Sequence, residues 1–219
     1  MSATATVEQP RRLTPTRVII AAIIATIGLL LTAFSVFAGL NAVANNPVAQ
    51  GVSSGTLSLT MSANGAGFSS AISNMAPGDV VNRYVALTSG GTLAGNGLGL
   101  YVTDSTPTKL TTDSANGLQV TVKSCSVAWN ATAGTCGGTT TTLLASSPIS
   151  GLTSAAPGSL VTGAIASNTT YNLQVSTQLP NQSETTTNGT FPANTIQGLT
   201  ANLTWNFTEA QRTATTTNS

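Results

Sequence analysis

Residues 73–93, SNMAPGDVVNRYVALTSGGTL, contain the features that decide the fold. The Pro77-Gly78-Asp79 turn suits type II geometry, in which proline presets φ and glycine supplies a positive φ. A run of Val, Tyr, Leu and Thr follows and ends at a Gly-Gly pair. Such a run between turn residues predicts a β-strand, and we expect Asp79 to cap backbone N–H groups where the strand begins.

Period-two alternation of apolar and polar side chains recurs along the chain. In the last segment, Leu203, Trp205 and Phe207 share one face, and Asn202 and Asn206 share the other. This alternation is typical of antiparallel strands with one buried and one solvated face. We expect eight strands, at residues 55–62, 67–73, 80–89, 98–104, 118–129, 139–147, 169–179 and 198–211. Short strands separated by Gly, Pro and Asn predict an all-β fold, an antiparallel β-sandwich of the jelly-roll type.

The first 38 residues differ in composition from the rest of the chain. Three arginines precede an apolar run, residues 18–40, in which the sequence VFA ends at Ala38. This order predicts a secretory signal peptide with a hydrophobic helix, cleaved between Ala38 and Gly39 by a signal peptidase. An uncleaved membrane anchor is the alternative, because the run is long enough to span a bilayer. In both cases the remaining chain is exported, and any membrane contact is made by the leader.

The exported part has little charge. From residue 39 onward it carries four basic and five acidic side chains, a net charge of −1. This balance excludes nucleic acid as a partner, because too few cations are present to neutralise phosphates. Its length is that of a single domain. We therefore expect a signal peptide at 1–38, a linker at 39–54, one β-domain at 55–212 and a disordered Thr-rich tail at 213–219.

The chain has two cysteines, Cys125 and Cys136, in the segment CSVAWNATAGTC. In an exported protein two cysteines most simply pair with each other, so we expect a disulfide. A metal centre is disfavoured because the chain contains no histidine and no third thiol. Asp104 and Asp113 flank a loop in which calcium is a weaker alternative, although the EF-hand spacing is missing.

No catalytic constellation is recognisable in the sequence. Residues 51–55, GVSSG, match the nucleophile elbow of hydrolases, but that motif needs a strand-to-helix turn and a histidine base. The five acidic residues of the exported part are scattered singly, so their spacing predicts no acid–base pair. We therefore expect no catalytic residue, no cofactor and no enzymatic activity.

Four segments in order resemble the TasA/camelysin family of secreted proteins, which a SipW-type signal peptidase processes. They are the leader ending in VFA, GTLSLTMS at 55–62, ISNMAPGDVVNRYVALTSGGTL at 72–93 and LTANLTWNFTEAQ at 199–211. The resemblance covers nearly the whole chain. This sequence departs from the family in its low charge, its cysteine pair and its short Thr/Gly-rich middle. Some members have been described as metallopeptidases, but this chain lacks both histidine and the H-E-x-x-H motif.

The resemblance implies a structural subunit that assembles head to tail into extracellular fibres or a biofilm matrix. In such fibres the mature N-terminal segment of one subunit inserts as a strand into the next copy. The donor segment here would be Gly39, Leu40, Asn41, Ala42, Val43, Ala44, Asn45 and Asn46. The alternative is a monomeric cell-surface adhesin or glycan-binding module that uses exposed loops at 104–117 or 180–197. Both hypotheses place the protein outside the cell, either secreted or at the cell surface.

Overall fold

The computed structural model describes residues 15–16, 19–20, 23 and 51–217 of the chain, which divides into two units, Met1–Val52 and Ser53–Ser219. The described residues 15–16, 19–20 and 23 are helical. The expected cleavage site at Ala38 and Gly39 and the donor segment 39–46 lie outside the described residues. In the part of the chain that the structure describes, no helix is both long enough and apolar enough to span a membrane.

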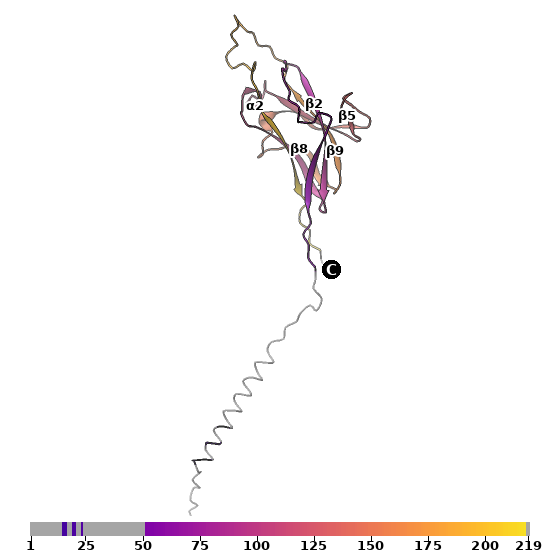
Figure 1. Cartoon of the computed structure of the whole chain (residues 1–219), viewed down its shortest axis with the longest axis vertical. Coiled ribbons are helices and arrows are strands. Elements are labelled where there is room, and N and C mark those ends of the chain that lie inside the picture. The colour runs from indigo at the N-terminus through magenta and orange to yellow at the C-terminus, as the bar shows by residue number, and fades with distance from the viewer. Residues whose placement is uncertain (1–14, 17–18, 21–22, 24–50, 218–219) are drawn as a thin grey trace, which may run out of the picture. The chain divides into compact units, whose positions relative to one another are not determined.

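The regular structure of the second unit is almost entirely antiparallel strands (Figure 1). They are β1 Leu57–Asn64, β2 Val80–Gly91, β3 Gly95–Asp104, β4 Gln119–Cys125, β5 Trp129–Asn130, β6 Thr135–Cys136, β7 Thr140–Pro148, β8 Gly158–Ile165, β9 Thr170–Gln178 and β10 Leu203–Gln211. A four-residue helix, α2 (Lys109–Thr112), and a 3₁₀ turn, Ile149–Gly151, interrupt them. The all-β antiparallel fold expected from the sequence is confirmed.

Two sheets share the main core. The larger has the order β1-β2-β9-β4-β7, the smaller has the order β10-β3-β8, and β5 and β6 form a separate hairpin. Leu87 of β2, Leu173 of β9 and Leu100 of β3 are fully buried in one cluster that joins both sheets. Burying a side chain of this size stabilises the fold by about 1.5–3 kcal/mol. The period-two pattern thus corresponds to the inner faces of the two sheets.

The turn before β2 forms as its residue types suggest. Gly78 has a φ of 96°, and Asp79 N donates a 2.9 Å hydrogen bond to Ala76 O. The Asp79 carboxylate accepts a 2.7 Å hydrogen bond from Ala76 N. Pro77, Gly78 and Asp79 therefore set the direction from which the chain enters β2.

Several strand predictions are wrong in detail. Residues 67–73 form turns and irregular structure, because Gly65 and Gly67 adopt φ values of 70° and 51°. The strand predicted at 118–129 ends at Cys125, and the strand predicted at 198–211 begins only at Leu203. The helix α2 was not expected from the sequence.

The strand β8 was also missed by the sequence pattern. Its two buried apolar residues, Leu160 and Ile165, are an odd number of positions apart. The pairing with β3 contains register shifts, which change the face that successive residues present. A strict period-two search therefore fails on this strand.

Candidate assembly edge and apical loop cluster

The inner face of β1 is only partly covered. Leu59 pairs with Ser89 and Met61 pairs with Leu87, so both β1 residues face the same side as the core. Ser89 and Leu87 are 1% and 0% exposed, whereas Met61 is 52% exposed. The larger sheet has five strands and the smaller has three, and within residues 51–217 no strand of the smaller sheet lies beyond β10.

The strand β10 has one free edge. It pairs with β3 through partners such as Trp205 with Val102 and Phe207 with Leu100. No second strand pairs with it in the part of the chain described here. An unpaired edge presents N–H and C=O groups that another strand can bind. We call this free edge, together with the inner face of β1 (Leu57, Leu59 and Met61), the assembly edge.

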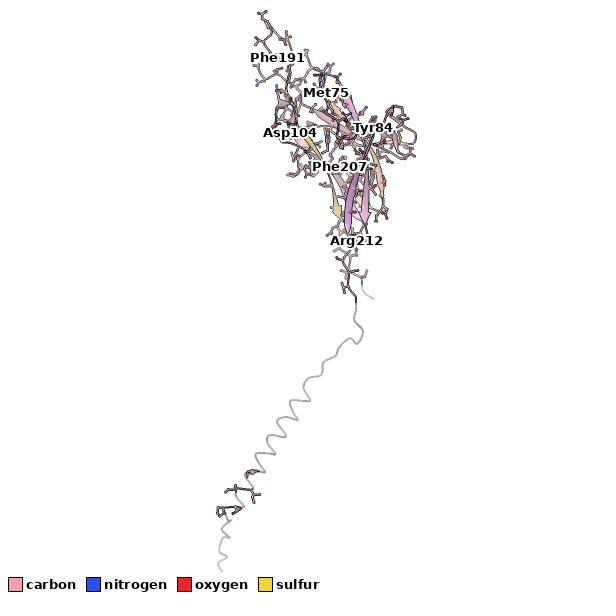
Figure 2. The ribbon with its side chains drawn as sticks, in the orientation of Figure 1. Met75, Tyr84, Asp104, Phe191, Phe207 and Arg212 are labelled. Carbon is pink, nitrogen blue, oxygen red and sulfur yellow. A yellow bond between two sulfur atoms is a disulfide. The ribbon has the colours of Figure 1, made fainter. Side chains whose placement is uncertain are left out.

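An aromatic cluster lies where β1 and β10 come into contact. Phe68, from the loop after β1, stacks on Trp205 with ring centroids 5.1 Å apart and on Phe207 with centroids 6.3 Å apart. Figure 2 shows Phe207 within the body of the β-domain. Trp205 and Phe207 are half-buried against the main core, as their place on one face of the alternating pattern predicts.

A single carboxylate lies on the inner face near the end of β10. Glu209 Oε1 accepts a 2.8 Å hydrogen bond from Ser89 Oγ. Burial, together with the negative charge of Glu209, raises the pKa of Tyr171 above its ordinary value. The Glu209 carboxylate therefore has a structural role, because its hydrogen bond to Ser89 links β10 to β2.

The two cysteines form a disulfide that closes a loop on the outer face of the larger sheet. Cys125 and Cys136 are bonded, with their Cα atoms 5.8 Å apart. The loop between them carries Trp129, which is buried against Tyr84 and donates a 3.0 Å hydrogen bond to Asn172 O. Trp129 therefore belongs to a small second core with Tyr84 and Cys125.

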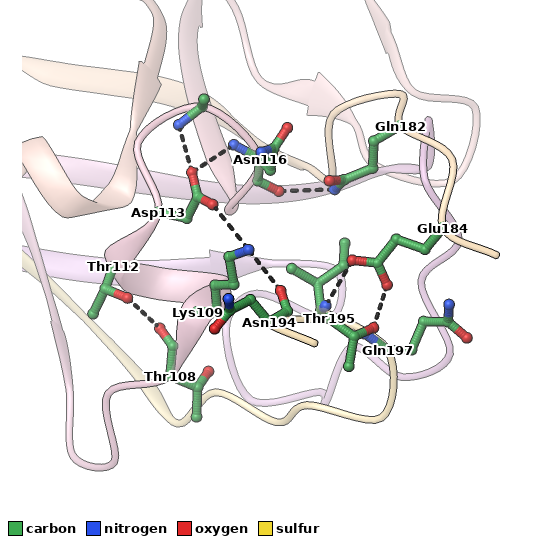
Figure 3. Close-up of polar contacts among 12 residues, drawn as sticks. Thr108, Lys109, Thr112, Asp113, Asn116, Gln182, Glu184, Asn194, Thr195 and Gln197 are labelled. Carbon is green, nitrogen blue, oxygen red and sulfur yellow. Dashed lines mark hydrogen bonds and ion pairs between the residues drawn. The ribbon is translucent and has the colours of Figure 1, made fainter. Parts of the chain in front are cut away.

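The two loops considered for ligand binding, 104–117 and 180–197, lie side by side (Figure 3). Lys109 Nζ donates a 2.6 Å hydrogen bond to Asn194 O and forms a 3.6 Å ion pair with Asp113. Gln182 Nε2 donates a 2.9 Å hydrogen bond to Asn116 O. We call these two loops the apical loop cluster. The sequence separation of the loops gave no signal that they would meet.

The three carboxylates of the apical loop cluster hold backbone and hydroxyl groups. Asp104 accepts hydrogen bonds from Thr106 N, Asn202 N and the Thr111 hydroxyl. Burial acts to raise the pKa of Asp104, but these hydrogen bonds outweigh it and lower the pKa below its ordinary value. The carboxylate is thus stabilised in its charged form.

The other two carboxylates behave in the same way. Asp113 accepts 2.9 Å hydrogen bonds from Asn116 N and Ala115 N, and these lower its pKa. Hydrogen bonds from the Thr195 hydroxyl and Ile196 N lower the pKa of Glu184. Asp104 and Asp113 thus close short turns, whereas Glu184 ties two distant parts of one loop together.

An open depression of about 360 Å³ lies beside the cluster. It is lined by Val102, Asp104, Pro107, Thr111, Thr112, Ile149, Ser150 and Thr153. Asp104 is the one ionisable group in this lining. The lining mixes apolar side chains with hydroxyl groups, and the calcium alternative at Asp104 and Asp113 gains no third acidic ligand from it.

One comparison identifies the family. The sequence profile of the camelysin metallo-endopeptidase family matches residues 15–216. The chain belongs to the camelysin family. The match spans the leader region and the β-domain together and confirms the resemblance inferred from the four sequence segments. No curated protein matches the chain. Membership of the camelysin family is compatible with a secreted or cell-surface protein.

The family description corrects one expectation. The camelysin family is described as a metallo-endopeptidase family, which contradicts the prediction from the sequence that this chain is not an enzyme. That prediction is withdrawn. It rested on the missing histidine and on acidic residues that are scattered singly along the sequence.

The donor groups of this camelysin-family chain do not fit a zinc centre. Protein zinc sites use histidine, thiolate and carboxylate ligands, usually three or four together. The chain has no histidine, and Cys125 and Cys136 are bonded to each other. Within the described residues, no three His, Cys, Asp or Glu side chains gather where they could hold a metal ion. We derive no catalytic step through a metal.

Proposed function

We propose that this chain is a secreted structural subunit that assembles head to tail into extracellular fibres or a biofilm matrix. In this proposal, Gly39–Asn46 of one subunit adds as a strand to the free edge of β10 in the next. The observation that carries the proposal is the unpaired edge of β10 beside the half-exposed inner face of β1.

The geometry of the assembly edge suits one additional strand. A strand added at β10 becomes the fourth strand of the smaller sheet and lies over the inner face of β1, where Met61 is 52% exposed. Eight donor residues extend over about 26 Å, and β10 itself has nine residues. Main-chain hydrogen bonds supply affinity in this mode, and alternate side chains fill the space below the strand.

The donor segment and the assembly edge are also chemically complementary. The donor segment carries no charged side chain. The inner face of the assembly edge is apolar at Leu57, Leu59 and Met61 of β1 and at Leu203, Trp205 and Phe207 of β10. A donor at one end of the chain and an acceptor on the β-domain form a heterologous contact. Such contacts give open filaments when the rotation between subunits does not close a ring.

The proposal also includes a jelly-roll topology and a cleaved signal peptide. Successive strands pass repeatedly between the two sheets, and the order β2-β9-β4-β7 facing β3-β8 supports a jelly roll. The leader is proposed to be a signal peptide cleaved between Ala38 and Gly39. Cleavage frees the donor segment, so that only exported subunits can polymerise.

The test compares two truncations of the mature chain 39–219. Removing 39–46 should leave a folded monomer, seen by size-exclusion chromatography, that forms no filaments by negative-stain electron microscopy. Removing the tail 213–219 is the matched control and should leave filaments intact. Filaments from the chain that lacks 39–46 would overturn the proposal, and so would a mature chain that stays monomeric at every concentration.

The apical loop cluster supports the second candidate, an adhesin or glycan-binding module. Phe191 is 53% exposed at the end of a projecting loop (Figure 2). An exposed aromatic ring can stack on a ligand. This function predicts that the monomer is retained on immobilised glycans and that Phe191→Ser abolishes retention. Equal retention of both proteins would contradict it.

A further inference from the structure

We propose that Phe68 and Leu40 compete for one position. Before assembly the Phe68 ring fills it, and in the fibre the Leu40 side chain of an incoming donor strand takes its place. The loop at residues 65–72, which we call the plug loop, then has to leave the assembly edge before the next subunit can join. This inference rests on the proposed function and adds an internal competitor at the same site.

The Phe68 ring lies on the apolar surface of β10. The ring stacks on both aromatic side chains of β10, with interplanar angles of 13° to Trp205 and 29° to Phe207. These two residues belong to the strand with the free edge, and their rings form the apolar surface that a neighbouring strand would cover. Phe68 reaches that surface from a loop, so it shields the edge without pairing with it.

The plug loop is held to β2 by polar contacts of limited strength. Arg83 Nη2 donates to Ser70 O at 3.1 Å and to Ala71 O at 3.4 Å, and both contacts are exposed. Hydrogen bonds of this kind contribute about 0.5–1.5 kcal/mol each. The Phe68 stack is therefore the main anchor of the plug loop, and a competing side chain at the same place can release it.

Two glycines form a hinge at the start of the plug loop. Gly65 and Gly67 lie in the left-handed region, with φ values of 70° and 51°. Just before them, Asn64 Nδ2 donates a 2.9 Å hydrogen bond to Trp129 O in the disulfide-closed loop. The residues up to Asn64 are thus fixed, and the glycines allow the following residues to change direction.

Leu40 is the side chain that suits the vacated place. Within Gly39–Asn46 it is the largest apolar residue, and the others are Gly, Ala, Val and Asn. Leu40 and Ala42 point to the same face of an extended strand. Only Leu40 can replace most of the apolar area that Phe68 buries. Before assembly, most subunits have Phe68 in place and only a small fraction have the edge open. The apparent affinity of the edge for the donor is the intrinsic affinity multiplied by that open fraction.

The experiment measures filament growth of the mature chain 39–219 by light scattering. Phe68→Ala removes the competitor, and we expect growth about fivefold faster than that of the unchanged chain. Phe191→Ala is the matched control, since it removes a phenylalanine far from the assembly edge, and growth should not change. Phe68→Leu, which keeps more of the packing, should accelerate growth less and serves if Phe68→Ala fails to fold.

A second variant tests the competition directly. Leu40→Ala should slow growth at least fivefold, and adding Phe68→Ala should recover part of the loss, because the weakened donor no longer has to displace the ring. Failure of recovery, or slower growth of folded Phe68→Ala, would show that Phe68 is only a packing residue. If filaments require 39–46 but Phe68→Ala grows no faster, the plug is wrong and the proposed function stands. If filaments form without 39–46, the proposed function itself fails.

Discussion

Phe68 stacks on Trp205 with ring centroids 5.1 Å apart and 13° between the ring planes. The first residue belongs to a glycine-rich loop and the second to the last strand of the fold. Their contact ties the connection between β1 and β2 to the edge of the smaller sheet. It is the point at which the stability of the subunit and its proposed assembly depend on the same side chains.

The stacked pair should contribute measurably to stability. A double-mutant cycle with Phe68→Ala and Trp205→Ala should give a coupling energy of about 0.5–1.5 kcal/mol in urea unfolding. The control cycle pairs Phe68→Ala with Phe191→Ala, and its coupling should stay within about 0.5 kcal/mol because the two rings do not interact. Equal coupling in both cycles would disprove the direct contact.

Loss of the disulfide should destabilise the β-domain. The bond between Cys125 and Cys136 closes a loop with a sequence separation of 11, for which chain entropy predicts about 3 kcal/mol. The double variant Cys125→Ser/Cys136→Ser should therefore unfold at lower denaturant, and the fluorescence of Trp129 should report a looser loop. Val127→Ala, at an exposed position in the same loop, is the control and should change stability by less than about 0.5 kcal/mol. An unchanged midpoint for the double variant would contradict this prediction.

The hinge at Gly67 should not tolerate a side chain. A Cβ there would lie 2.6 Å from Ala63 Cβ, and the φ of 51° is already unfavourable for alanine. Gly163 is the control: its φ of 84° is also unfavourable for alanine, but no atom lies within 4 Å of a Cβ placed there. Comparing the two positions separates the cost of the backbone conformation from the cost of the steric clash. We expect Gly163→Ala to cost about 1–2 kcal/mol and Gly67→Ala to cost about 1–3 kcal/mol more. If thermal or denaturant unfolding showed the same loss of stability for both variants, the loop would have to move away from Ala63 at no cost, which would contradict the prediction.

The apical loop cluster should weaken in acid. Hydrogen bonds lower the pKa of Asp104, Asp113 and Glu184 in the folded chain, so the folded state binds fewer protons than the unfolded state. Their contribution is complete above the ordinary carboxyl pKa of about 4 and is lost as the pH falls through the lowered folded values. The hydrogen-exchange protection factors of residues 104–117, which correct for the intrinsic pH dependence of exchange, should therefore fall below about pH 4.

Asp104→Asn provides the control for the acid effect. The amide cannot ionise, so the difference in stability between the unchanged chain and this variant should be largest near neutral pH. It should shrink as the pH falls below about 4. A difference that stays constant across that range would show that the charge on Asp104 contributes nothing to the fold.

The sequence determined those features that depend on neighbours along the chain. Period-two alternation fixed the all-β antiparallel class, because each strand needs one apolar face whatever its partner. The turn at Pro77 and Gly78 followed from the φ values that these two residues favour. The disulfide between Cys125 and Cys136 followed from the presence of two thiols in a chain that is expected to be exported. The family resemblance was equally visible, since its four segments keep their order.

Only the tertiary structure decided which strands and loops meet. The register shifts in β8 hid that strand, and the left-handed Gly65 and Gly67 turned a predicted strand at 67–73 into the plug loop. Nothing local to Phe68 indicates Trp205 as its partner, and nothing near Lys109 indicates Asn194. The exposed face of Met61 arises because one sheet has more strands than the other. A sequence pattern specifies the direction of each side chain, whereas the surface that it meets depends on strand order, which is set by contacts between distant segments.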